Sequence, residues 1–157
     1  MVKIKIIATG LVKNKNIKPI TDEYYKRISR WAQISEEFLP EVLVKNEGEI
    51  EAKKQKEGKL QLEKAEGFII AMDKGGIMPS SEEFAKKLDN IMASGNSTIS
   101  FIIGGSNGLD KAVLNRADLI LSFGKITYAH EIMRICLSEQ IYRAFTILNN
   151  IAYHKYK

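Results

Sequence analysis

The side chains best suited to acid–base or nucleophilic chemistry lie in the last third of this chain. Both histidines, His130 and His154, and the only cysteine, Cys136, follow residue 98. Their spacing matches no zinc-binding pattern, so no metal site is expected. A catalytic cysteine needs a paired base, and the apolar neighbours of Cys136 instead indicate a buried thiol in a reducing compartment. The imidazoles are therefore the groups to consider for proton transfer near neutral pH.

Two further groups accompany the histidines. Glu139 and Arg143 are four residues apart in an amphipathic stretch, so they lie on one side of a helix and can pair. The chain closes with Tyr153, His154 and Lys155, then Tyr156 and Lys157, which combines aromatic rings with cations. Such a tail suits stacking on unpaired RNA bases, although a frayed terminus explains it as well.

Three loops follow apolar runs of about six residues that suit buried strands, 67–72, 98–103 and 118–123. The loop 104–108 reads GGSNG, and its glycines allow a close approach of backbone to a ligand or a tight packed turn. It is neither a dinucleotide fingerprint nor a P-loop. The loop 122–128 can offer backbone amides and apolar contacts to a flat heterocycle. In a parallel sheet these loops lie at the ligand-binding edge.

The remaining elements must position these loops. The pattern predicts strands at 2–8 and, as an edge strand around Pro40, at 37–44. It predicts helices at 22–31 with Thr21 as N-cap, at 80–95 with a Ser80/Glu83 capping box, at 110–116 and at 131–149. Residues 47–66 indicate a mostly exposed helix interrupted near Gly58, or partial disorder. We interpret residues 1–157 as one α/β domain with a mostly parallel sheet and flanking helices.

The last helix and the distribution of charge indicate which partners the protein can bind. Apolar residues cover more than one face of 131–149, so a second subunit can contact it in addition to its own sheet. Lys and Arg exceed Asp and Glu by 8 to 2 in residues 1–30 and by 5 to 2 in 124–157, whereas acids exceed bases by 15 to 11 between them. Basic ends suit a polyanion such as RNA, or simply keep a protein in solution. No apolar run approaches the ~20 residues of a membrane span, which favours a cytosolic location.

Three spaced motifs resemble one family. The chain reads FIIGGSNG at 101–108, LILSFGKITYAHEIMR at 119–134 and EQIYRAFTILNNIAYHK at 139–155. Together they resemble the RlmH (YbeA-like) family of SPOUT methyltransferases, and the resemblance covers the whole chain. It implies a deep C-terminal trefoil knot over about 98–157, S-adenosyl-L-methionine as cofactor and a homodimer with shared active sites. It also implies methylation of N3 of a pseudouridine in helix 69 of large-subunit (23S) rRNA, on assembled ribosomes in the cytoplasm.

The resemblance also assigns residues. The expected cofactor contacts are Met72, Gly104, Phe123, Gly124, Lys125, Ile126, Thr127 and Tyr128. The catalytic candidates are His130, Glu139, Arg143, Tyr153 and His154, and we expect the tail of one subunit to bring His154 to the target base beside the other subunit's cofactor. The RNA phosphates are assigned to Arg134, Lys155, Lys13, Lys15 and Arg27, with Arg143 as a further candidate. Gly124 stands at a frequent serine, and Ala129 and Ala152 replace prolines, which loosens the local backbone.

Two other interpretations stay open. A non-enzymatic RNA-binding or ribosome-associated module explains the charge pattern, but it needs no ligand-type loops at three strand ends. A Rossmann-type methyltransferase acting on a small molecule requires a glycine motif after the first strand, where this chain has only Thr9-Gly10.

Overall fold

The computed structural model describes residues 1–155, so Tyr156 and Lys157 of the expected tail lie outside the described residues. Five strands form one sheet in the order β2-β1-β4-β3-β5, and every neighbouring pair is parallel. The elements along the chain are β1 (Val2–Thr9), α1 (Ile17–Ile28), β2 (Ala32–Leu39), the 3₁₀ turn η1 (Glu47–Glu49), α2 (Ile50–Lys64), β3 (Phe68–Ile77), α3 (Ser81–Ala93), β4 (Thr98–Ile103), α4 (Lys111–Arg116), β5 (Leu119–Leu121) and α5 (His130–Leu148). The α/β class with a parallel sheet is confirmed.

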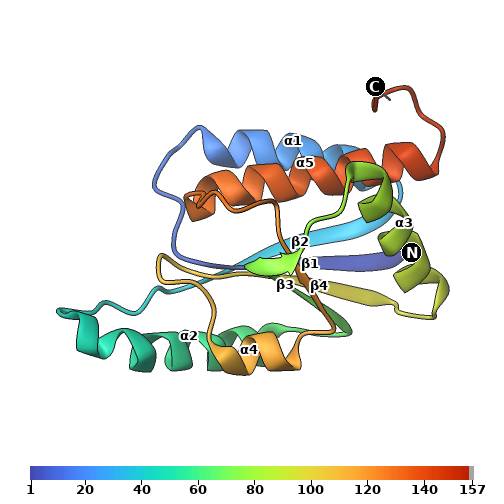
Figure 1. Cartoon of the computed structure of the whole chain (residues 1–157). Coiled ribbons are helices and arrows are strands. Elements are labelled where there is room, and N and C mark those ends of the chain that lie inside the picture. Colours follow the sequence, from blue (N-terminus) through green and yellow to red (C-terminus); the bar gives the residue numbers. More distant parts are fainter. Residues whose placement is uncertain (156–157) are drawn as a thin grey trace.

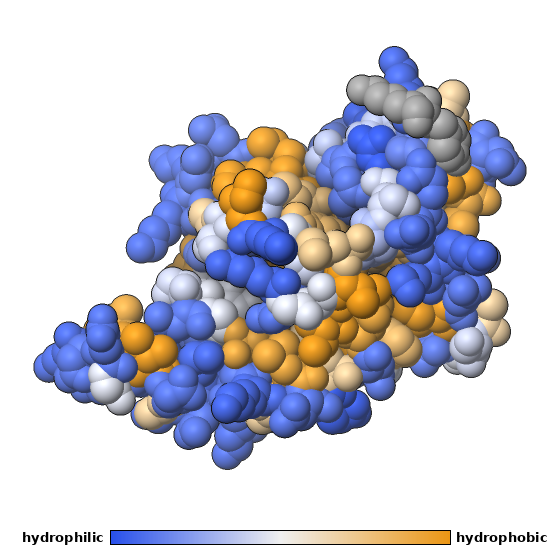
Figure 2. Space-filling view, in the orientation of Figure 1, coloured by the Kyte–Doolittle hydropathy of each residue, from blue (hydrophilic) through white to orange (hydrophobic). Residues whose placement is uncertain are grey.

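Helices cover both faces of the sheet (Figure 1), and in the same view hydrophobic residues gather toward the middle of the molecule, with hydrophilic ones around them (Figure 2). The face under α1, α3 and α5 holds the larger hydrophobic core, and the face under α2 and α4 holds the smaller one. Successive strand residues alternate between these cores: Ile70 belongs to the first, whereas Ile69 and Ala71 belong to the second. This burial on both sides explains why the central strands read as continuous apolar runs.

The helix predicted at 22–31 and the strand predicted at 37–44 both lie earlier in the chain, as α1 (Ile17–Ile28) and β2 (Ala32–Leu39). Helix α1 begins at Ile17, after Asn16, rather than at Asp22. Pro19 is tolerated because the first-turn N–H groups of a helix have no intrahelical partner. Thr21 is therefore a buried helical residue, not an N-cap, and its hydroxyl donates to the Lys18 carbonyl at 3.1 Å. The second strand ends at Leu39 instead of running through Pro40, because proline cannot donate to the ladder.

The charged segment 47–66 differs most from the structure predicted for it. Helix α2 continues through Gly58 without a break, and Lys53, Glu57 and Gln61 on one side of it are buried. A Cβ at Gly58 would lie 3.1 Å from atoms of Asp110 and Val113, so glycine lets α2 pack closely on the start of α4. The expectation of a mostly exposed, interrupted helix was wrong because this buried face is polar.

The elements that carry the site follow the prediction more closely. The Ser80/Glu83 capping box of α3 is confirmed, with the Glu83 N–H donating to Ser80 Oγ at 3.1 Å. Strand β3 extends past Met72 to Ile77 through an irregularity in its pairing with β5, where a loop had been expected. The Ser122 N–H donates to the Ile77 carbonyl at 2.8 Å, which ties the end of this extension to the loop after β5.

Candidate functional site

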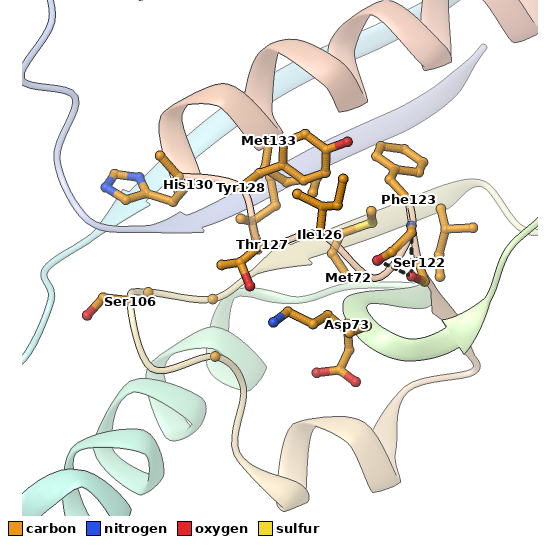
Figure 3. A pocket seen from close by; sticks show the side chains of 18 of the residues that line it. Met72, Asp73, Ser106, Ser122, Phe123, Ile126, Thr127, Tyr128, His130 and Met133 are labelled. Atoms are coloured by element: carbon orange, nitrogen blue, oxygen red, sulfur yellow. Dashed lines mark hydrogen bonds between the residues drawn. The ribbon is translucent and has the colours of Figure 1, made fainter. Parts of the chain in front are cut away.

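A pocket of about 710 Å³ lies at the carboxyl ends of β3, β4 and β5. Figure 3 shows side chains from these strand ends and from the start of α5 around one space. The lining residues are Met72, Asp73, Lys74, Ile103, Gly104, Gly105, Ser106, Asn107, Gly108, Leu121, Ser122, Phe123, Gly124, Ile126, Thr127, Tyr128, Ala129, His130 and Met133. The three strand-end loops singled out in the sequence therefore meet at one cavity of the size of a small-molecule site.

The glycine loop after β4 is a tight turn. The Gly108 N–H donates to the Gly105 carbonyl at 3.1 Å, which closes the turn. A Cβ on Gly104 would lie 2.9 Å from the carbonyl carbon of Gly108, so no larger residue fits there without moving the backbone. The packed turn considered for these glycines is therefore present, at a place where the loop also lines the pocket.

The loop after β5 forms an apolar wall. Ser122 accepts from the Gly124 N–H and donates to the Gly124 carbonyl, each at 3.1 Å, and Gly124 has φ +113°. This small turn directs the chain around the pocket. Ile126 is 73% exposed although it lines the cavity, and such an exposed apolar side chain suits contact with a bound heterocycle.

Seven of the eight expected cofactor contacts line the pocket. The exception is Lys125, which lies exposed in the loop outside this lining. Met72 is almost fully buried at the base, where an apolar side chain was expected. The loop 122–128 predicted from the sequence includes Ser122, whereas Met133 was not expected in the site. Met133 was assigned only to the apolar stripe of the last helix, and the Ser-x-Gly spacing of 122–124 is the signal that indicates a side-chain-closed turn.

His130 stands at one end of the pocket, at the first residue of α5. Its ring packs on Gly10, where a Cβ would lie 3.0 Å from Cε1 and from Nε2. Among the described residues, buried Nδ1 has no hydrogen-bond partner. The ring thus links the first loop of the chain to the pocket end of α5.

The other catalytic candidates form a separate cluster near the end of α5. Glu139 Oε1 accepts from Arg143 Nε at 3.0 Å, from Arg143 Nη2 at 2.6 Å and from the Tyr153 hydroxyl at 2.9 Å. Burial, and then the hydrogen bond to Glu139, raises the pKa of Tyr153 above its ordinary value. Tyr153 is consequently a protonated donor at neutral pH rather than a base.

His154 belongs to the same cluster. Its Nδ1 lies 3.1 Å from Arg143 Nη1, and its Nε2 lies 2.7 Å from Glu82 Oε1 on α3. A guanidinium only donates, so Nδ1 is the acceptor and Nε2–H donates to Glu82. This hydrogen bond is the main cause that lowers the pKa of Glu82. The contacts therefore select one ring tautomer and orient the imidazole.

Within one chain this cluster does not reach the pocket. None of Glu139, Arg143, Tyr153 and His154 lines it. Met133 and Arg143 are ten residues apart on α5, which is ~15 Å along a helix. A smaller cavity of about 400 Å³ lies beside the pocket, sharing Phe123, Gly124 and Tyr128 with it and reaching Cys136 and Gln140. His130 is the one catalytic candidate that the fold brings to the pocket.

One of the expected phosphate ligands is ruled out. Arg134 is fully buried, donates through Nε to Glu36 Oε1 at 2.6 Å, and lies over the Phe38 ring with its guanidinium carbon 4.3 Å from the centroid. The assignment of Arg134 to RNA was wrong, because the side chain ties α5 to β2 inside the protein.

The other basic candidates are at the surface. Lys13, Lys15 and Lys155 are exposed, and Arg27 pairs with Glu23 at 3.0 Å. The backbone N–H of Lys13 donates to Glu131 Oε1 at 2.8 Å, so the first loop is held at the start of α5, next to His130. The two loop lysines thus lie near the pocket end of α5.

Within residues 1–155, every helix is too short or too polar to span a bilayer. Nor, within the same residues, do three or more His, Cys, Asp or Glu side chains converge as metal ligands would.

The fold and the site define a class first. The sequence matches the family described as "Predicted SPOUT methyltransferase" over residues 2–154. The structure is similar to a probable methylase family protein from Haemophilus influenzae, with a TM-score of 0.52, 14% identity, and coverage of 99% of this chain and 70% of that one. That likeness concerns the fold.

Proteins of similar sequence identify one family within this class. The ribosomal RNA large subunit methyltransferase H of Ruminiclostridium cellulolyticum is 43% identical over 98% of this chain and 99% of its own length. The protein of the same name from Limosilactobacillus fermentum is 45% identical over 97% and 99%. The chain therefore belongs to the SPOUT methyltransferases, in the family of ribosomal RNA large subunit methyltransferase H.

Proposed function

We propose that this protein is an S-adenosyl-L-methionine-dependent methyltransferase that modifies large-subunit (23S) rRNA. Its target is N3 of a pseudouridine in helix 69, and its substrate is the assembled ribosome. Membership of the methyltransferase H family supports rRNA as the substrate class. The observation that carries the proposal is the pocket in which the glycine loop, the 122–128 loop and the start of α5 meet.

The pocket fits this cofactor in size and chemistry. Its volume of about 710 Å³ accommodates a nucleoside with an amino-acid arm. Met72, Ile126 and Met133 offer apolar contact to a flat adenine ring, and the glycine turn brings backbone close to the ligand. Asp73 at the rim offers a carboxylate to an ammonium group. When bound, the cofactor supplies a methyl group on a positively charged sulfonium.

The protein must then align the target nitrogen and accept its proton. N3 of a pseudouridine carries an imide proton that has to leave as the nitrogen becomes nucleophilic. His154 is the proposed acceptor through Nδ1, which takes the proton after it releases the hydrogen bond that it accepts from Arg143 Nη1. Glu82 and Glu139 hold His154, Arg143 and Tyr153 in place. Lys13, Lys15, Arg27 and Lys155 are proposed to contact RNA phosphates, and Arg143 provides positive charge near the base.

A homodimer unites the two parts of the site in this proposal. The ~15 Å of helix between the pocket and the C-terminal cluster favours a site in which the tail of one subunit serves the pocket of the other. The apolar belt of α5, with Ile132 44% exposed, supports contact with a second copy. The deep trefoil knot over about 98–157 is part of the same proposal, as is a cytoplasmic location.

The test uses the purified full-length protein, labelled S-adenosyl-L-methionine and ribosomes from cells that lack this protein. We expect one methyl group per large-subunit rRNA, located by mass spectrometry as N3-methylpseudouridine in helix 69. His154→Ala should reduce the rate by about 10²–10⁴-fold, which is the contribution of a general base. Ribosomes from wild-type cells are the control because their target is already methylated. Cofactor binding without any methyl transfer to rRNA would exclude the proposed substrate, and the absence of cofactor binding would favour a non-enzymatic RNA-binding module.

A further inference from the structure

A buried lysine lies behind the glycine loop, on the side away from the cavity. Lys53 of α2 is only 4% exposed, and its ammonium group contacts three oxygen atoms. These are Glu41 Oε1 at 2.8 Å, Asn107 Oδ1 at 2.7 Å and Ser106 Oγ at 3.1 Å. An ammonium group has three donors, so each has an acceptor. Figure 1 shows α2 beside α4 on the face of the sheet opposite α5.

Glu41 completes the contact with the loop. Its Oε1 accepts from the Ser106 N–H at 3.0 Å and from the Ser106 hydroxyl at 2.6 Å. A Cβ on Gly105 would lie 3.0 Å from this same oxygen. Burial alone would raise the pKa of Glu41, but the hydrogen bonds from Lys53 and Ser106 outweigh it and lower the pKa to about 2. The carboxylate is therefore charged at every pH at which the protein works.

The segment that carries Glu41 is itself held by α2. Glu57, one turn after Lys53, accepts from the Val42 N–H at 3.0 Å and is 1% exposed. All three partners of Lys53 lie outside α2: Glu41 follows β2, and Ser106 and Asn107 line the pocket. Helix packing alone does not require a buried lysine, because a buried ammonium group without its partners destabilises the folded state by several kcal/mol. Its contacts instead define the conformation of the glycine loop.

We propose that Lys53 and Glu41 are positioning residues for the methyl-donor pocket. They touch no ligand and act through Ser106 and Asn107, keeping the 104–108 turn in the shape that receives the cofactor before it arrives. This inference rests on the proposed function of the pocket. Preorganisation of a binding loop increases affinity because less ordering remains for the bound state. Loss of the pair should therefore weaken cofactor binding while transfer from bound cofactor continues.

The experiment compares Lys53→Met and Glu41→Gln with Lys54→Met in the full-length protein. Lys54 is the adjacent lysine of the same helix, and its only ion pair is a long contact of 3.9 Å to Glu51 among the described residues. Titration calorimetry with S-adenosyl-L-methionine should show affinity reduced about tenfold or more for Lys53→Met, since it removes three hydrogen bonds from a charged group. Glu41→Gln should show a smaller reduction, because its amide oxygen can still accept from Lys53 and Ser106 while the negative charge is lost. Lys54→Met should bind as the wild type does, and Lys53→Arg, which keeps the charge, should recover part of the affinity.

Kinetics separate positioning from a general loss of folding. The positioning variants should raise KM for the cofactor, with kcat at saturating cofactor and KM for ribosomes unchanged. Glu41→Gln keeps the shape of the side chain and decides the question if Lys53→Met does not fold. Equal cofactor affinity in Glu41→Gln and Lys54→Met would overturn the inference while the proposed function stands. Failure of the wild type itself to bind the cofactor would overturn the proposed function and this inference together.

Discussion

Two glycines at and near the pocket lie where there is little room for a side chain. Gly104 and Gly10 are both approached by atoms at about 3 Å from where a Cβ would be, the first by the Gly108 backbone and the second by the His130 ring. A backbone atom cannot move aside as the end of a flexible side chain can. The constraint at Gly104 is therefore the stricter of the two.

Replacement of Gly104 by alanine should reduce the affinity for S-adenosyl-L-methionine. The added Cβ would lie 2.9 Å from the Gly108 carbonyl carbon and would push the turn out of shape. We expect at least a tenfold loss, comparable to strain of roughly 1–3 kcal/mol, measured by calorimetry. Gly48→Ala is the matched control, because there a Cβ meets only the Asn46 side chain, at 3.2 Å. Wild-type affinity in Gly104→Ala would mean that the ligand does not use this turn.

Acid stability should depend on Glu41. Its folded pKa of about 2 lies below the ordinary 4.5, so its charged form stabilises the native state above about pH 4.5, and this contribution disappears as the pH falls toward 2. Glu41→Gln should be less stable than the wild type by roughly 1–3 kcal/mol at pH 6, and the difference should shrink between pH 4.5 and 2. Urea unfolding at several pH values measures this. A difference that stays constant across the range would contradict the assignment.

At the scale of elements, buried polar pairs connect helices to the sheet. Arg134 of α5 pairs with Glu36 of β2, and Gln61 of α2 donates to Thr9 Oγ1 of β1 at 2.8 Å. Each pair joins a helix to a strand that is distant in sequence. Hydrophobic packing alone tolerates small sliding of a helix, whereas a buried hydrogen bond selects one register.

Arg134→Ala should therefore destabilise the protein. Truncation leaves the Glu36 carboxylate, whose side chain is 10% exposed, without its cation. We expect a loss of about 3–5 kcal/mol in the free energy of unfolding, measured by urea denaturation. Arg116→Ala, which removes an exposed arginine of α4, should change stability by less than about 0.5 kcal/mol. Unchanged stability of Arg134→Ala with weakened ribosome binding would restore the RNA assignment.

At the scale of the whole molecule, the pocket and the C-terminal cluster lie at different positions along α5. The first loop, held to Glu131, and the tail, held to Glu82 and Glu139, place the basic ends of the chain at these two positions. In a dimer with shared sites, the pocket of one subunit and the C-terminal cluster of the other form one active site. Mixing variants tests this arrangement.

Neither a variant that lacks residues 153–157 nor Gly104→Ala should methylate ribosomes at low cofactor concentration. Co-expression of the two chains should restore about a quarter of the wild-type activity, because random pairing yields half heterodimers, each with one intact shared site. Co-expression of Gly104→Ala with itself is the control. Activity that stays at the level of the separate variants would show that each chain uses its own tail.

Much of this protein is determined locally in the sequence. The apolar runs before residues 73 and 104 specify the central strands β3 and β4, because strands buried on both faces are apolar throughout. The run before residue 124 is equally apolar, but it forms only Leu119–Leu121 of the edge strand β5. The Ser80/Glu83 box sets the start of α3 by side-chain hydrogen bonds three residues apart. Parallel strands bring their carboxyl ends together, so the sequence predicts that the glycine loop and the 122–128 loop lie close to each other, as they do around the pocket.

Only the tertiary structure decided the roles of the polar residues in helices. Helix α2 carries Lys53, Glu57 and Gln61 at every fourth residue, a spacing that solvent-facing residues also show. Nothing in the local sequence shows that these side chains form hydrogen bonds with Glu41, Val42 and Thr9. The burial of Arg134 could not be foreseen for the same reason, because its partner Glu36 is 98 residues away. A charged side chain is buried only where the fold places an oppositely charged or hydrogen-bonding partner next to it. Long-range packing, not the local sequence pattern, determines where that happens.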